Sequence, residues 1–301
     1  VIFSDKKAVG VKIKNSKGIN TITCTSEIIL SGGSINSPQI LMLSGIGPKA
    51  QLEKHGIPCI EDISGVGQNL QDHLTVNVSS TIKELDTFKE LMTPFKMIKN
   101  LYAYYFANKG LMTYPASDIG VFFKTKQNIS RPDIQIHFAP GAGKYNKNGA
   151  MKPTSGITAS VCNLRPKSRG YLELTSSRAD DSPKIYANYL SAPEDLQVMI
   201  NGVKRTREIF KTNIMRGLSA KETMPGNKCI SDKDLEEFIR SEALSVYHPV
   251  GTCKMGNGAE CVVGNDLTVK GLRGIRVADA SIFPEIISGN TNATCNVIGA
   301  K

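Results

Sequence analysis

Apolar and polar side chains alternate along the first part of the chain at the period of a β-strand. Residues 11–14 and 19–23 both alternate in this way, and residues 15–18 between them, Asn-Ser-Lys-Gly, form a turn sequence. The shorter run 27–30 is mostly apolar, which is typical of a strand buried in a parallel sheet. The pattern predicts a hairpin followed by one buried strand.

A glycine turn and a helix are predicted directly after this strand. Gly32 and Gly33 favour a sharp turn, and Gly45 favours the end of a helix. Ser37 is a good N-cap, with Pro38 at the first helical position. A strand, a glycine turn and a helix N-terminus are the geometry with which α/β folds hold phosphates and dinucleotides. A plain turn with glycines for tight packing explains the same residues equally well.

Residues 74–241 have a different sequence pattern from residues 1–73, because β-rich stretches alternate with long loops. Strands are predicted at residues 118–123, 133–138 and 170–174. Two helices follow, one behind a capping box at residues 191–194 and one that begins near Ser231. Their apolar residues recur at helical spacing and indicate core positions: Leu196, Met199, Ile200, Val203, Leu235, Phe238 and Ile239.

The last part of the chain again has a sequence pattern typical of an α/β fold. Residues 274–279 predict a short strand that ends in an acid, Asp279, and residues 288–294 form a loop rich in glycine and asparagine. A helix is predicted at residues 295–301. An acid at the carboxyl end of a parallel strand lies where ligands bind in open sheets.

Composition and charge exclude several classes of function. The chain has 301 residues, of which 40% are hydrophobic and 21% charged, which fits a globular protein of two domains. Its net charge of +10 comes from scattered lysines, and aromatic residues make up only 6%, so nucleic-acid binding is not expected. No apolar run is long enough to predict a membrane-spanning helix. There is no initiator Met, so we expect the chain to begin inside a longer protein.

The seven cysteines form no CxxC pair, so neither a zinc ribbon nor a thioredoxin-type site is expected, and no metal is predicted. Cys253 and Cys261 are close enough in sequence for a disulfide, although free thiols explain them as well. Residues 77–79 and 128–130 fit the glycosylation sequon, which is a weak sign of a secreted protein.

Five stretches of the chain together resemble the glucose–methanol–choline (GMC) oxidoreductases, and especially their insect glucose dehydrogenase-like branch. The stretches are GGSINSPQILMLSGIG, GVGQNLQDH, RPKSRGYLEL, YHPVGTCKMG and LRGIRVADASIFPEIISGNTNAT. The resemblance implies an FAD-dependent alcohol oxidoreductase. The GxGxxG of the family's amino-terminal part is missing here, so we expect this chain to be a carboxyl-terminal part of such a protein.

The fold implied by the resemblance is a partial α/β FAD-binding domain with an α+β substrate domain built on an antiparallel sheet. Residues 1–73 and 242–301 would belong to the FAD-binding domain, and residues 74–241 to the substrate-binding domain. The return segment 242–301 would carry the catalytic residues.

The same resemblance implies a set of flavin contacts. Gly32 and Gly33 fall where the backbone passes close to FAD, Asp279 falls on an acid that binds the ribityl–pyrophosphate region, and Ala280 follows it. Residues 290–294 fall beside the isoalloxazine ring, where a helix N-terminus would stabilise negative charge. The implied cofactor-binding residues are Gly32, Gly33, Asp279, Ala280, Asn290, Thr291, Ala293 and Thr294.

The resemblance also implies that His248 is the catalytic base and Asn292 its partner. Alcohol oxidation needs a group that removes the hydroxyl proton, and imidazole is suited to this because its ordinary pKa, about 6.5, lies near working pH. An amide can hold the substrate oxygen without competing for the proton. Taken alone, His248 would more often be a structural histidine and Asn292 a turn or capping residue. We interpret His73 as structural support for its loop, and Asp72 as a hydrogen-bond acceptor within it.

The expected partners are an alcohol and an electron acceptor. The alcohol would be a sugar, a steroid such as an ecdysteroid, or a small alcohol, and the acceptor would be a quinone or oxygen. A different class of function stays open, a flavin-binding paralogue without redox turnover that serves as a lyase, carrier or scaffold.

Overall fold

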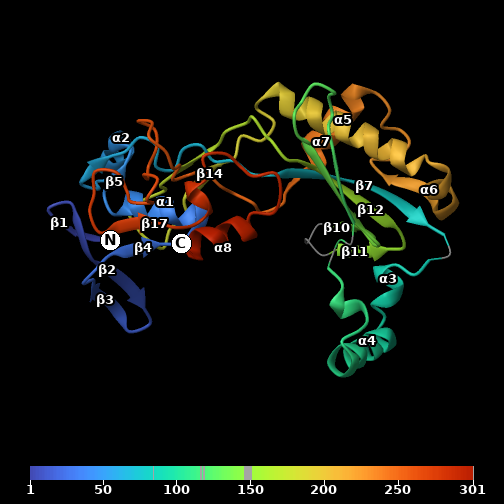
Figure 1. The fold of residues 1–301 in the computed structure, drawn as a ribbon, viewed down its shortest axis with the longest axis horizontal. Helices are drawn as coiled ribbons and strands as arrows, with labels where there is room; N and C mark the ends of the chain where they lie inside the picture. Colours follow the sequence, from blue (N-terminus) through green and yellow to red (C-terminus); the bar gives the residue numbers. More distant parts are fainter. Residues whose placement is uncertain (84, 116, 118, 146–150, 301) are drawn as a thin grey trace. The chain divides into compact units, whose positions relative to one another are not determined.

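The computed structural model describes residues 1–83, 85–115, 117, 119–145 and 151–300 (Figure 1). The chain divides into two compact units, each built from separated stretches. Unit 1 consists of Val1–His73, Pro166–Ser191 and Tyr247–Lys301, and unit 2 consists of Leu74–Arg165 and Ala192–Val246.

Residues 166–191 lie in unit 1, although the predicted boundaries assign them to the middle domain. Backbone hydrogen bonds explain their place. Leu70 and Gly170 exchange N–H···O bonds of 2.9 and 2.8 Å, and Leu172 N–H donates to the carbonyl of Gly67 over 2.7 Å. The segment is thus bonded to the loop that precedes unit 2 in sequence.

Short sheets make up the β-structure of unit 1. The predicted hairpin is present as β2 (Lys7–Asn15) and β3 (Gly18–Thr23), and β1 (Ile2–Ser4) extends it. The predicted buried strand is β4 (Ile28–Leu30), which pairs in parallel with β17 (Ile275–Val277). The remaining strands are β5 (Ile46–Gly47) with β6 (Glu61–Asp62) and β13 (Tyr171–Glu173) with β14 (Lys184–Tyr186).

Helix α1 (Gly33–Leu43) begins earlier than predicted, with Gly32 rather than Ser37 as its N-cap. The hydroxyl of Ser37 accepts from the N–H of Gly32 over 2.9 Å, so Ser37 supports the turn from inside the helix. Pro38 therefore lies inside α1, where it cannot bond to the carbonyl of Ser34. The hydroxyl of Thr252 donates to that carbonyl over 2.6 Å instead.

The other helical elements of unit 1 are α2 (Lys49–Lys54), the 3₁₀ turn η2 (Ala280–Ile282) and α8 (Asn292–Ala300). The helix predicted at residues 295–301 is α8, and residue 301 lies outside the described residues. The unit has one apolar core whose fully buried members include Leu41, Met42, Ile46, Val66, Val250, Val263 and Val277.

Unit 2 is built on a six-stranded antiparallel sheet. Along it lie β15 (Ser219–Met224), β7 (Leu74–Ile82), β12 (Ile157–Asn163), β9 (Ile134–Ala139) and β8 (Ile119–Phe123), and β16 (Leu244–Ser245) also pairs with β7. Residue 118, the first of one predicted strand, lies outside the described residues. The strands β10 (Ala142–Tyr145) and β11 (Met151–Thr154) form a separate two-stranded antiparallel sheet.

Helix α5 (Pro193–Phe210) packs on β12, and α7 (Asp232–Glu242) packs beside α5 (Figure 1). The predicted capping box at residues 191–194 is wrong, because the N-cap is Ala192 with no side-chain bond and Pro193 occupies the first turn. The helix predicted near Ser231 does have a capping box, formed with Asp234. Unit 2 also contains α3 (Phe88–Leu91), α4 (Pro94–Ala107), η1 (Leu111–Thr113) and α6 (Asn213–Leu218).

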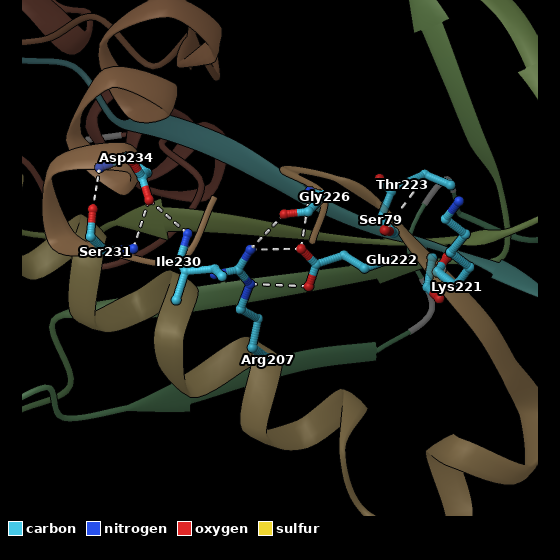
Figure 2. Close-up of polar contacts among 10 residues, drawn as sticks. Ser79, Arg207, Lys221, Glu222, Thr223, Gly226, Ile230, Ser231 and Asp234 are labelled. Carbon is cyan, nitrogen blue, oxygen red and sulfur yellow. Dashed lines mark hydrogen bonds and ion pairs between the residues drawn. The ribbon is translucent and has the colours of Figure 1, made fainter. Parts of the chain in front are cut away.

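A half-buried ion pair fastens α5 to the sheet of unit 2 (Figure 2). Arg207 donates to Glu222 through Nε over 3.0 Å and through Nη2 over 2.7 Å. Glu222 also accepts from the N–H of Gly226 over 3.0 Å. This bidentate geometry fixes the helix, the strand β15 and the turn after it in one register.

The structure confirms the predicted architecture, a part with parallel β-strands and helices and a part built on an antiparallel sheet. All the described cysteines are free, so Cys253 and Cys261 form no bridge, and both are buried. Among the described residues no group of acids, histidines and cysteines could hold a metal ion. No helix in the described ranges is long and apolar enough to span a membrane.

Candidate active site

His248 lies in a loop of unit 1 that is bonded on two sides. Val250 exchanges backbone hydrogen bonds of 3.0 and 2.8 Å with Gln71, and the N–H of Gly251 donates to the carbonyl of Ala280 over 3.2 Å. The backbone N–H of His248 itself donates to Oδ1 of Asp72 over 2.9 Å. The loop is therefore held between residues 69–73 and residues 279–286.

The loop is also tied to the start of α1. The hydroxyl of Ser34 donates to the carbonyl of Pro249 over 2.6 Å, and Thr252 donates to the Ser34 carbonyl that Pro38 leaves without a helical partner. The proline within α1 thus makes room for a bond from the histidine loop.

Gly251 occupies a position that a larger residue would not fit. Its φ is +92°, and a Cβ atom there would lie 2.6 Å from the carbonyl oxygen of Asn69. Asn69 in turn donates from its side chain to the carbonyl of Gly251 over 3.2 Å. This close approach sets the path of the backbone three residues after His248.

The imidazole of His248 contacts a second histidine. Nδ1 of His248 and Nδ1 of His73 lie 3.0 Å apart, and the rings meet edge to face with an interplanar angle of 80°. His73 is 1% exposed and Asp72 is 8% exposed. Asp72 also accepts from the hydroxyl of Tyr189, so its carboxylate joins three segments of the chain. Asp72 is a hydrogen-bond acceptor in the loop, as predicted.

The surroundings of His248 favour a neutral imidazole. Burial lowers the pKa of His248 below its ordinary value of 6.5, and the carboxylate of Asp72 acts in the opposite direction with a smaller effect. Desolvation disfavours the imidazolium, so the ring is mostly neutral near pH 7 and can accept a proton.

Asp279 organises the glycine turn between β4 and α1. Its Oδ2 accepts from the N–H of Gly33 over 2.9 Å and from the hydroxyl of Ser37 over 2.6 Å. Its Oδ1 accepts from the N–H of Ser281 over 2.8 Å. A carboxylate has about four acceptor positions, so roughly one is left for a ligand hydroxyl.

The turn at Gly33 has room for a ligand to lie against the backbone. Its φ is +78°, and no atom lies within 4 Å of the position that a Cβ would occupy. The residues present therefore fit a dinucleotide at this turn. Ala280 follows Asp279 and is partly buried.

The second predicted cluster surrounds the start of α8, whose first residue is Asn292. Asn290, Asn292 and Ala293 are exposed, and Thr291 and Thr294 are partly buried. Among the described residues no hydrogen bond connects Asn292 with His248. The pairing of these two side chains stays a prediction.

The sequence alone did not reveal the contact between His73 and His248. From the sequence, His73 is expected to support its loop, and no local pattern points to Tyr189. The one sequence signal was the QDH triplet at the end of a family stretch, which lies 175 residues before His248.

Two family models, both described as GMC oxidoreductase, match residues 1–75 and residues 166–299. The chain belongs to the GMC oxidoreductase family. It is 42% identical to an alcohol dehydrogenase [acceptor] of Pseudomonas putida over 97% of this chain and 53% of that protein. It is 38% identical to an oxygen-dependent choline dehydrogenase of Brucella anthropi over 100% of this chain and 55% of that protein.

Solved structures of FAD oxidoreductases share the fold of this GMC chain. A formate oxidase from Aspergillus oryzae, solved in work on its FAD modification, matches with a TM-score of 0.90 and 25% identity over 99% of this chain and 57% of its own. An FAD-dependent oxidoreductase from Chaetomium thermophilum matches with a TM-score of 0.88 and 24% identity over 100% of this chain and 58% of its own.

The chain spans about half the length of the curated relatives it matches. Those relatives are bacterial and their names refer to alcohol and choline, so the insect glucose dehydrogenase-like branch is not shown by them.

Proposed function

We propose that the protein oxidises an alcohol, with FAD as its cofactor and His248 as the proton acceptor. Membership of the GMC oxidoreductase family supports the reaction class. The observation that carries the role of His248 is its fixed, half-buried imidazole, whose pKa is lowered by burial so that the neutral base is present near pH 7.

FAD would supply the acceptor for the hydride that leaves the carbinol carbon. The chain's own contribution is to position groups around that carbon. His248 would take the hydroxyl proton, and its backbone bond to Asp72 and ring contact to His73 would hold the imidazole in place. Asn292 would donate from its amide to the substrate oxygen.

Two parts of unit 1 would hold the cofactor. The turn formed by Gly32, Gly33, Asp279 and Ala280 would take the dinucleotide, supported by the open space at Gly33 and by the remaining acceptor position of Asp279. Asn290, Thr291, Ala293 and Thr294 would lie beside the flavin ring, where the N-terminus of α8 favours negative charge.

The substrate class rests on the relatives. Their names support a simple alcohol or choline as the first compounds to test. A sugar or an ecdysteroid, and with it the insect branch, stays a prediction from the five stretches. For the electron acceptor, the name of one relative specifies oxygen and that of the other leaves the acceptor open, so both oxygen and a quinone belong in the assay.

The test uses the full-length protein purified with its flavin. Under anaerobic conditions it is mixed with a panel of primary alcohols, choline, glucose and an ecdysteroid, and the visible flavin absorbance is followed. We expect at least one alcohol to bleach the flavin, and dithionite serves as the control that the flavin can be reduced. If dithionite bleaches the flavin and none of the alcohols does, the flavin-binding paralogue without turnover is the better description.

A further inference from the structure

We infer that His73 sets the tautomer of His248, by accepting a hydrogen bond from Nδ1–H of His248 and so leaving Nε2 of His248 with its lone pair. The inference rests on the proposed role of His248 as the base. It makes His73 a positioning residue, because His73 acts on the reaction through the ring of His248.

The argument starts from the 3.0 Å between the two Nδ1 atoms. A hydrogen bond of this length needs one N–H and one lone pair, so the two nitrogens share a single proton. If Nδ1 of His73 carries the proton, neutral His248 must carry its own proton on Nε2. If Nδ1 of His248 carries it, Nε2 of His248 is bare.

These two arrangements differ in their chemistry at the free nitrogen of His248. In the first, Nε2–H can only donate, so His248 cannot take a proton from an alcohol. In the second, Nε2 accepts a proton directly. A base at position 248 therefore requires the second arrangement, in which His73 is neutral and its Nδ1 is the acceptor.

The second arrangement also survives the proton transfer. After Nε2 has accepted a proton, Nδ1–H of His248 still donates to His73, and the bond becomes charge-assisted. This stabilises an imidazolium that burial otherwise disfavours. In the first arrangement this transfer cannot occur, because Nε2 of His248 already bears a proton.

The position of His73 suits an acceptor of this kind. The residue is 1% exposed, so water competes little for its Nδ1. The backbone on either side is fixed, since Gln71 pairs with Val250 and Asp72 accepts from His248 N–H and from Tyr189. Asp72 accepts from the backbone N–H of His248, and Tyr189 is joined to the pair through Asp72.

The test compares two substitutions in the full-length, flavin-loaded protein. His73→Asn places an amide oxygen near the position of Nδ1 and can still accept, whereas His73→Leu has a similar bulk and no acceptor. We expect His73→Leu to lower the rate of flavin reduction by on the order of 10²-fold, within the range of general-base catalysis, with little change in KM. His73→Asn should restore most of that loss.

A second readout is taken from the wild-type protein, and a substitution serves only to assign the signals. With ¹⁵N-labelled histidine, long-range ¹H–¹⁵N spectra of the wild-type protein report which ring nitrogen of each neutral histidine carries the proton, and the signals of His248 are those lost in His248→Asn. We expect His248 to be protonated on Nδ1 and bare on Nε2.

A neutral His248 protonated on Nε2 would overturn the inference, as would a His73→Leu protein that reduces flavin at the wild-type rate. The experiments distinguish a failure of His248 as the base from a failure of His73 as its positioning residue. If His248→Asn is as fast as wild type, the proposed base is wrong. If His248→Asn is slow and His73→Leu is not, only the role of His73 is wrong.

Discussion

The contacts that stabilise each unit internally are of different kinds. Around the candidate site of unit 1, single hydrogen bonds join side chains to backbone groups far away in sequence: Asp72 with His248 over 176 residues, Ser34 with Thr252 over 218, and Gly33 with Asp279 over 246. Unit 2 depends on regular ladders between long strands, and on α5 packed over them.

This difference indicates which substitutions should destabilise each unit. In unit 1 a polar side chain or a glycine fixes the path of a loop, so its loss leaves buried groups without partners. In unit 2 the backbone groups of the strands bond to one another within the sheet, and α5 buries apolar side chains such as Met199 and Val203 over it. The residues for which we propose a part in the chemistry lie mostly in the loops of unit 1.

Gly251→Ala should have the largest effect on stability. The added Cβ would lie 2.6 Å from the Asn69 carbonyl oxygen, at a φ of +92°. We expect a loss of about 2–4 kcal/mol in the free energy of unfolding, measured by urea denaturation of the full-length protein. The control is Gly217→Ala in helix α6 of unit 2, where a Cβ meets no atom within 4 Å and should stabilise the helix by about 0.5–1 kcal/mol. Equal effects at the two glycines would contradict the contrast between the units.

Asp279→Ala should come next. It removes the acceptor for Gly33 N–H, the Ser37 hydroxyl and Ser281 N–H, and the residue is 8% exposed. We expect a loss of about 2–3 kcal/mol and weaker retention of flavin, measured by urea denaturation and by the flavin absorbance after dialysis. Asp266→Ala, at an exposed acid bonded to Thr268, is the control and should change stability by less than about 0.5 kcal/mol.

In unit 2 the corresponding polar contact is Arg207 with Glu222. Arg207→Lys keeps the charge and loses the bidentate geometry, which should cost about 1 kcal/mol in thermal or urea unfolding. Arg240→Lys changes an exposed pair with Glu236 on α7 and should cost less than about 0.5 kcal/mol. A larger loss for Arg207→Lys than for Asp279→Ala would reverse the comparison of the two units.

The regular elements could be predicted from the sequence because their signals are local. Alternation gave the hairpin β2–β3, and the pattern behind Ser231 gave α7 with its buried Leu235 and Ile239. The predicted start of helix α1 is too late, because Ser37 and Pro38 have the features of a helix start. They are tolerated inside it because Thr252, distant in sequence, bonds to the freed carbonyl. No local pattern could supply that partner.

The same limit applies to the site. Asp279 could be predicted at the end of its strand, but its bonds to Gly33 and Ser37 depend on how β4 pairs with β17. His73 looked like loop support because nothing near it in sequence explains a ring contact. Contacts between residues so far apart in sequence depend on tertiary packing. They cannot be predicted from a short stretch of a single sequence.

The smallest expected effect is a shift in the pH dependence. Because burial lowers the pKa of His248 below 6.5, the rate of flavin reduction should rise with pH on the acid side and level off once the imidazole is neutral. Asp72→Asn keeps an oxygen that can accept from the His248 N–H and removes the charge that favours the imidazolium. The pKa of His248 should fall further, so the acid limb of the profile should move to lower pH. If the acid limb moved to higher pH, the charge of Asp72 would not be favouring the imidazolium of His248.

The most direct test of His248 as the base is the rate of flavin reduction by an alcohol in a stopped-flow experiment on the full-length, flavin-loaded protein. The wild type is compared with His248→Asn and with His55→Asn, which changes a partly buried histidine at the end of α2. We expect His248→Asn to retain its flavin and to be slower by roughly 10²–10⁴-fold, with His55→Asn close to wild type. A His248→Asn protein that reduces its flavin as fast as the wild type would contradict the assignment.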